Sequence, residues 1–425
     1  MKEDLLHYIW KYKKYPINSL QSTCGKSIQV KSSGLHNLLS GPDFFNAQIE
    51  VDGQLWAGNV EIHVKSSDWF AHNHQSDASY DNVILHVVWT DDITIHRKDG
   101  TQIPTLSLQQ YISVQLLETY RELFNTKNYK FINCENDFKE VDDFVKNNWL
   151  DRLFVERLRS KSDDIKELLN FANHDWEYVL FLMLLKNFGS KINADAFLAI
   201  GKSINFSIVR KLHGQPLVLE SLLMGQAGFL DKETGLDKYY AELRKEYQYL
   251  KAKYGLVQPL IRPNFFKLRP LNFPTIRLAQ FSKIYATNNT LFHNLIKQED
   301  GDASTLMNLG THEYWHTHYT FDKESSKKIK NVTNSFIRLV TINTVVPLKF
   351  YYQKYTGKEN HENLFNIMGS LKKETNSIIE GYREIGGHIN NAKTSQAYLQ
   401  LYNQYCKTHK CLDCSIGAHL MNIKV

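Results

Sequence analysis

The feature that most constrains the fold is a pair of strand patterns joined by a two-residue turn within residues 41–90. Residues 44–51 and 54–65 are rich in β-forming side chains and flank Asp52-Gly53, a dipeptide typical of tight hairpin turns. Such a pair predicts an antiparallel hairpin, and a further apolar run that follows it, residues 83–89, predicts a buried strand beside the hairpin. Residues 93–96 and 102–106 predict a second hairpin. The N-terminal part of the chain should therefore contain a β-sheet.

Acidic and basic side chains lie at informative positions on these two strands. Residues two apart on a strand share a face, so Glu61, His63 and Lys65 should point the same way. Asp43 opens the preceding strand, and the hairpin should bring it close to Glu61. Two carboxylates on adjacent strands suit a divalent cation such as Mg²⁺ or Mn²⁺, which takes oxygen ligands and leaves room for a phosphate.

An Asp opening one strand, followed by Glu-x-(Lys or a substitute) on the next and then by a helix and another strand, resembles the PD-(D/E)XK nuclease superfamily. The resemblance implies an α+β domain with a restriction-endonuclease-like mixed sheet and flanking helices. It implies that Asp43 and Glu61 hold the metal ion, and that His63, at the usual Lys position, and Lys65 orient water or offset charge. His86 would be accessory. A leading helix often adds a carboxylate in this superfamily.

That leading helix is predicted at residues 3–13, with Glu3 or Asp4 as the candidate carboxylate. Because His63 stands at the Lys position, the protein could also be an inactive relative of these nucleases that binds nucleic acid without cleaving it. Over nearly its full length the chain is also similar to an uncharacterised bacterial family with a domain of unknown function, through strings such as GNVEIHVKSSDW, LRPLNFPTIRLAQ, INTVVP and CLDCSIG. This second resemblance implies no activity.

The chain of 425 residues is longer than one hydrophobic core usually serves, so two or three domains are expected. We predict an α+β domain over residues 1–110 and a helical domain over residues 111–425, in which residues 258–274 are the candidate boundary. Helical periodicity supports the second domain. It covers residues 141–170, 176–188, 216–226, 236–254, 332–350, 372–384 and 392–405.

The net charge and the first residues bear on partners and location. Lys and Arg number 51 against 45 Asp and Glu, and this balance of +6 is compatible with nucleic acid as a partner. No apolar run approaches the roughly 18 residues that span a membrane. Acidic residues near the start argue against a secretory signal, so a cytoplasmic protein without membrane contact is expected.

Two histidine patterns offer zinc as an alternative. His72, His74, Asp77 and His86 combine imidazoles with a carboxylate in the same stretch as the carboxylate pair. His312-Glu313-Tyr314-Trp315-His316 matches H-E-x-x-H, which on a helix would place two zinc ligands one turn apart with a glutamate base. Because the usual continuation of the motif is missing, a zinc hydrolase is a minor alternative.

Near the C-terminus, Cys406, Cys411 and Cys414 surround His409. Three thiols and an imidazole could hold a structural zinc ion, and Cys134 or Cys24 could complete a four-thiolate iron–sulfur site. Buried thiols without a ligand are the favoured interpretation.

A basic, Pro-rich segment lies near residue 265, where Arg262, Lys267, Arg269 and Arg277 alternate with phenylalanines. Cations among aromatic rings suit a nucleic-acid strand, although a linker packed on helices would have a similar composition. No phosphate-binding, dinucleotide-binding or serine-hydrolase motif is present. The sequence therefore predicts a metal-dependent nuclease, or a protein that binds nucleic acid or another partner on a degenerate nuclease fold.

Overall fold

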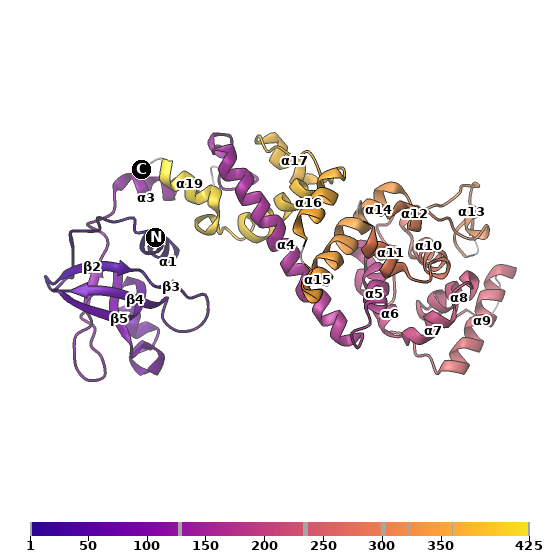
Figure 1. The fold of residues 1–425 in the computed structure, drawn as a ribbon, viewed down its shortest axis with the longest axis horizontal. Helices are drawn as coiled ribbons and strands as arrows, with labels where there is room; N and C mark the ends of the chain where they lie inside the picture. Colours follow the sequence, from indigo (N-terminus) through magenta and orange to yellow (C-terminus); the bar gives the residue numbers. More distant parts are fainter. Residues whose placement is uncertain are drawn as a thin grey trace. The chain divides into compact units, whose positions relative to one another are not determined.

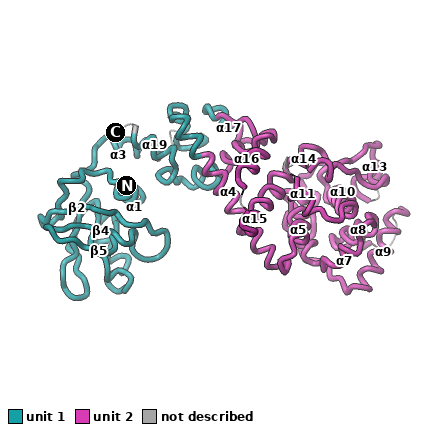
Figure 2. The backbone as a smooth tube through the Cα atoms, in the orientation of Figure 1, with its two compact units in different colours: residues 1–149, 381–387, 401–425 teal, residues 150–380, 388–400 magenta. Residues whose placement is uncertain are grey.

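The computed structural model describes residues 2–423, apart from 126–129, 233–236, 299–302, 322 and 359. These residues form two compact units (Figure 2). Unit 1 comprises residues 1–149, 381–387 and 401–425, and unit 2 comprises residues 150–380 and 388–400. Within the described ranges, every helix is too short or too polar to cross a membrane.

Unit 1 is built on a mixed β-sheet (Figure 1), as predicted for an α+β protein. Its order is β1-β2-β4-β5-β6-β7, with β3 paired to β4. The strands β2, β4 and β5 are antiparallel neighbours, whereas β5, β6 and β7 are parallel neighbours. Their bounds are β1 (Leu20–Gln21), β2 (Ser27–Ser32), β3 (Leu35–His36), β4 (Phe44–Val51), β5 (Gln54–Lys65), β6 (Val83–Thr90) and β7 (Thr105–Ser107).

The β4–β5 hairpin has the predicted bounds and the predicted turn. Asp52 and Gly53 both have left-handed backbone conformations, with φ of 48° and 83°, as a two-residue hairpin turn requires. A bulge at Asn46, whose φ is 55°, then shifts the register so that Phe44 pairs with Val60. Because of this register, Asp43 lies across from the next residue of β5, Glu61.

A short crossover connects β5 to the parallel strand β6. It consists of α2 (Asp68–Ala71) and two 3-10 turns, η1 (His74–Ser76) and η2 (Ala78–Tyr80). A small hydrophobic cluster anchors the crossover, formed by Trp69, Tyr80, Val83, Ile95 and Ile103. The predicted hairpin after β6 is reduced to one bridge between His96 and Gln102, and the chain continues into β7, which pairs with β6 instead.

Helices from both ends of the chain complete unit 1, so this unit extends beyond residue 110, where we predicted the boundary. Helix α1 buries Leu5, Leu6, Ile9 and Trp10 and packs on β5. The C-terminal helix α19 packs on α3, and the turn η7 packs on α1. The bounds are α1 (Glu3–Lys11), α3 (Val114–Leu123), η3 (Phe138–Glu140), η6 (Tyr402–Cys406), η7 (Cys411–Asp413) and α19 (Ser415–Ile423).

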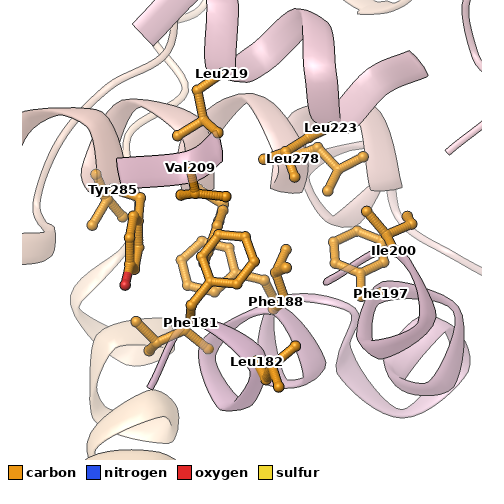
Figure 3. Close-up of a cluster of buried hydrophobic side chains, with 14 of the residues drawn as sticks. Phe181, Leu182, Phe188, Phe197, Ile200, Val209, Leu219, Leu223, Leu278 and Tyr285 are labelled. Carbon is orange, nitrogen blue, oxygen red and sulfur yellow. The ribbon is translucent and has the colours of Figure 1, made fainter. Parts of the chain in front are cut away.

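Unit 2 is helical around one large core, in which aromatic rings such as Phe181, Phe188 and Tyr285 pack together (Figure 3). Residues 258–274 lie inside this unit. The remaining elements are α4 (Asp143–Phe171), α5 (Trp176–Phe188), α6 (Ser190–Lys202), α7 (Phe206–Lys211), α8 (Pro216–Gln226), α9 (Lys238–Tyr254), η4 (Pro270–Asn272), α10 (Pro274–Thr287), α11 (Leu291–Lys297), α12 (Ser304–Met307), α13 (Tyr314–Thr317), β8 (His318–Thr320), β9 (Lys323–Glu324), α14 (Asn334–Val340), the π-helical η5 (Thr341–Val345), α15 (Val346–Thr356), α16 (His361–Ser370), α17 (Ser377–Glu384) and α18 (Ala392–Leu401).

Candidate metal centre

The β4–β5 hairpin brings Asp43 and Glu61 together. The main-chain N–H of Asp43 donates to Glu61 Oε2 at 3.1 Å, and the N–H of Ile62 donates to Asp43 Oδ2 at 2.9 Å. Each carboxylate is thus fixed by the backbone of the opposite strand, an arrangement that follows from the bulge and register described above.

Two histidines lie beside the Glu61 carboxylate, and two more contact one of them. On β5, His63 Nε2 lies 3.4 Å from Glu61 Oε1, and on the crossover His74 Nε2 lies 3.3 Å from the same oxygen. The His63 ring is also within hydrogen-bonding distance of His86 Nε2 on β6, at 2.9 Å, and of His72 Nδ1 at 3.1 Å. We call these four side chains the histidine cluster. Donor atoms of His63, His72 and His74 all lie within 4.8 Å of one another.

Helix α1 adds a histidine to the site that was not predicted from the sequence. His7 Nε2 lies 3.2 Å from Asp43 Oδ2, and Glu3, one helical turn earlier, interacts electrostatically with Asp43 and His7. Of the two acidic residues predicted here, Glu3 belongs to the site, whereas Asp4 accepts a hydrogen bond from the Tyr120 hydroxyl at 3.1 Å. The spacing of four residues between Glu3 and His7 was the signal that could have revealed this histidine.

Burial sets the protonation of the centre. Burial, with the nearby Asp43 charge as the next contribution, raises the pKa of Glu61 to about 9. Burial and neighbouring imidazoles lower the pKa of His63 to about 2, and burial and His74 lower that of His86 to about 3. Burial alone would lower the pKa of His7, but Asp43 and the other nearby carboxylates outweigh burial, so the pKa of His7 is raised. Without a metal ion, the imidazoles His63 and His86 are therefore neutral at pH 7, as metal ligands must be.

Carboxylate oxygens and neutral imidazole nitrogens in one place can hold a divalent cation, and imidazole suits transition ions better than Mg²⁺. A cation there would replace the proton on Glu61 and the contacts between imidazoles. The centre reaches solvent at His72, which is exposed, and at His7 and Asp43, whose side chains are each 22% exposed. A cavity of about 180 Å³, lined in part by Trp69, also reaches His74.

Two residues predicted for this region have exposed side chains. The Lys65 side chain is exposed at the end of β5. The main-chain N–H of this residue donates a hydrogen bond to the Asp68 carboxylate. Asp77 is exposed and accepts a hydrogen bond from the Ser79 N–H, which caps η2. The predicted third position of the nuclease motif is therefore occupied by the imidazole of His63, not by an ammonium group.

The H-E-x-x-H segment does not form the helix that the zinc interpretation needs. Helix α13 begins at Tyr314, so His312 precedes it, and the His312 ring stacks on Tyr239 with the centroids 4.6 Å apart. Trp315 is buried and donates to Glu220. Among the described residues, His312 and His316 belong to no group of three metal-binding side chains. The segment serves to anchor a loop on unit 2.

The predicted nucleic-acid contacts differ in exposure. Arg262 pairs with Asp231 at 2.9 Å, and Lys267 and Arg269 are exposed. Arg277 is only 7% exposed, and its guanidinium lies 3.7 Å from the centroid of a buried phenylalanine ring. It donates to Gln280 and Asn272. The prediction for Arg277 is therefore wrong: it is an internal residue, because α10 is buried almost all round.

A family model described as "Protein of unknown function (DUF2851)" matches residues 3–377. The matched range contains the whole candidate metal centre. Searches of curated proteins and of solved structures returned no match.

Proposed function

We propose, for a chain that belongs to the DUF2851 family of proteins of unknown function, that unit 1 is a metal-dependent nuclease-like domain that acts on nucleic-acid phosphodiester bonds. The observation that carries the proposal is the carboxylate pair Asp43 and Glu61 on one hairpin, with imidazoles at its side. The order of elements supports it: a leading helix, antiparallel strands, a crossover and a parallel strand agree with what the resemblance to PD-(D/E)XK nucleases implies.

The metal ion we propose is Mn²⁺, with Mg²⁺ as the weaker of the two predicted ions. Asp43 and Glu61 would supply oxygen ligands, and His63, His72 and His74, whose donor atoms lie within 4.8 Å of one another, would supply nitrogen ligands. Mn²⁺ accepts imidazole more readily than Mg²⁺, which prefers oxygen alone. A divalent ion held there would polarise a phosphoryl oxygen and lower the pKa of an attacking water.

The residues around the carboxylates have separate roles in this proposal. His63, neutral and held between His86 and His72, would serve as a nitrogen ligand of the ion. His7, whose pKa is raised beside Asp43, lies near the exposed edge of the site and in its protonated form would offset the charge of a phosphate. Both roles use side chains that approach the carboxylates from different elements, β5 and α1.

One observation favours the alternative of a nucleic-acid-binding protein without cleavage. The ammonium group expected beside the carboxylates is missing, because His63 replaces it and Lys65 lies exposed at the strand end. A protein of this kind would bind nucleic acid and metal ions but leave the phosphodiester bond intact.

Cleavage assays on the full chain separate these functions. Labelled single- and double-stranded DNA and RNA are incubated with the protein in Mn²⁺, Mg²⁺ or a chelator. We expect cleavage in Mn²⁺, no cleavage with chelator, and a loss of roughly 100-fold or more in Asp43→Asn and Glu61→Gln, because these groups stabilise charge in the transition state. Glu50→Gln, which changes a carboxylate of the same hairpin paired with Lys31, is the control and should cleave normally.

Two other results of these assays would count against cleavage. Binding without cleavage by the wild-type protein would favour the alternative. If the protein neither binds nor cleaves any of the four substrates, the proposed function is rejected.

A further inference from the structure

Four of the five cysteines of the chain meet in unit 1. Cys134, from the turn before η3, lines one cavity of about 20 Å³ together with Cys406, Cys411 and Cys414 from the C-terminal segment. The fifth, Cys24, is exposed. The sequence analysis left open whether Cys24 or Cys134 could join the three C-terminal thiols, and the fold brings Cys134 to them.

The backbone around these thiols is arranged for close approach. Cys406 ends the π-helical turn η6, Cys411 begins η7, and Cys414 directly precedes α19. Gly417 allows η7 to pack against α19, because a Cβ at this position would lie 2.1 Å from the Cys411 carbonyl oxygen. The three C-terminal thiols thus come from three consecutive turns that converge on one cavity.

Hydrogen-bond donors are directed at the sulfur atoms. The Tyr382 hydroxyl lies 3.2 Å from Cys406 Sγ, and the main-chain N–H groups of Gly417 and Ile416 act to lower the pKa of the Cys414 thiol, against the larger effect of burial. A neutral thiol is a weak acceptor, whereas a thiolate that binds a metal ion accepts such bonds strongly. A set of buried thiols that served only as apolar packing would not need these donors.

His409, considered above as a fourth ligand, is directed elsewhere. Its Nδ1 lies 3.0 Å from Asn133 Oδ1, so the ring fastens the C-terminal loop beside Cys134. The ligand set that the fold offers is therefore four sulfur atoms.

We propose that Cys134, Cys406, Cys411 and Cys414 form a tetrathiolate site for a thiophilic metal centre, either one Zn²⁺ ion or an iron–sulfur cluster. Both take four cysteine thiolates. The site is separate from the carboxylates and histidines of the candidate metal centre. It would tie the C-terminal segment to the N-terminal part of unit 1.

The distances between the four sulfur atoms bear on the choice between a zinc ion and an iron–sulfur cluster. Among the described residues, the group of three donors within 4.8 Å of one another is the histidine group, so the four sulfur atoms are more widely spread. Zn–S bonds of about 2.3 Å would draw them together, whereas an iron–sulfur cluster would keep them apart. Binding in either form exchanges thiol protons for metal–sulfur bonds and releases these protons to solvent.

The test begins with the full chain purified without oxygen and without added metal. We expect about one zinc ion per chain, or iron with acid-labile sulfide and a broad visible absorption band. Cys411→Ser and Cys414→Ser should lose at least 80% of this metal, whereas Cys24→Ser should keep it. X-ray absorption at the zinc or iron edge should show sulfur as the first neighbour of the metal.

A second measurement uses wild-type protein, in case the variants do not fold. Titration with a mercurial reagent should release the metal as the four clustered thiols react, but not when Cys24 alone has reacted. The proposal is overturned if the anaerobic protein contains neither metal and takes up neither Zn²⁺ nor a reconstituted cluster. It is also overturned if metal content is equal in Cys411→Ser and wild type.

Discussion

Glu61 is the residue on which the candidate metal centre depends. Its side chain is 4% exposed, it accepts the N–H of Asp43, and its other oxygen faces two imidazoles. A carboxyl group so deeply buried is costly to ionise unless a cation is close. The arrangement is therefore consistent with a group that holds a proton in the metal-free protein and exchanges it for a metal ion.

His72 tests the contribution of one imidazole to metal binding. It is exposed and lies 3.1 Å from His63, so its removal leaves no buried cavity. We expect His72→Ala to weaken Mn²⁺ binding by roughly 10-fold to 100-fold, which is the usual effect of changing a group around a metal ion. Calorimetric titration measures this effect, and His213→Ala, which changes an exposed histidine of unit 2, is the control. Equal affinities for the two variants would exclude His72 from the site.

Sequence reasoning succeeded for residues placed by local structure and failed for residues placed by tertiary packing. The two-residue turn predicted the β4–β5 hairpin and so placed Asp43 near Glu61. The register of the turn alone would put Asp43 opposite Ile62, and the bulge at Asn46, which was not predicted, moves it opposite Glu61. His7 reaches the site because α1 packs on β5, and its spacing from Glu3 indicates a shared helix face but not which strand that face contacts. Arg277 was misjudged for the same reason, because its burial comes from the helices around α10.

At the scale of elements, the strands β4 and β5 and the helices α5 and α8 have the bounds that periodicity and turn residues predicted. The predicted helix over residues 332–350 is divided, because a π-helical turn, η5, separates α14 from α15. The predicted hairpin after β6 is formed only around the bridge between His96 and Gln102, since β7 leaves it and extends the sheet as a parallel strand. Pairing partners of short strands depend on the rest of the sheet, which local sequence does not encode.

The loop around Trp315 is held on α8 by a buried carboxylate, and this contact predicts a pH effect. Glu220 accepts hydrogen bonds from the Tyr239 hydroxyl at 2.7 Å and from the Trp315 indole at 2.6 Å. Burial raises the pKa of Glu220 from 4.5 to about 7, although these hydrogen bonds act in the opposite direction. The folded state therefore binds this proton more tightly than the unfolded state.

The sign of the effect follows from that difference. The contribution of Glu220 to the free energy of unfolding should be fully present below about pH 4.5 and fall as the pH rises to about 7. The total loss is on the order of 3 kcal/mol. The Glu220→Gln variant should not show this loss of stability and should be more stable than wild type at pH 8. Urea denaturation at pH 5 and pH 8 measures both effects. The exposed Glu167→Gln is the control, and an unchanged pH dependence in Glu220→Gln would contradict this account.

For the whole molecule, the important feature is that unit 1 is assembled from both ends of the chain. Its sheet carries the carboxylates and histidines, and its C-terminal segment, residues 401–425, brings three of the four clustered cysteines. Composition and periodicity correctly predicted an α+β class with a large helical part. They could not indicate that the chain returns to its first unit, because contacts between distant segments leave no periodic signal.

The central claim for the molecule is that Asp43 and Glu61, with the histidine cluster, hold one divalent transition-metal ion. Binding of Mn²⁺ measured by electron paramagnetic resonance tests it most directly, because free and bound Mn²⁺ give different signals. The account predicts one bound Mn²⁺ per chain in wild type and in Glu50→Gln, and its loss in Glu61→Gln. Undiminished binding of Mn²⁺ by Glu61→Gln, or no binding by the wild-type protein, would contradict it.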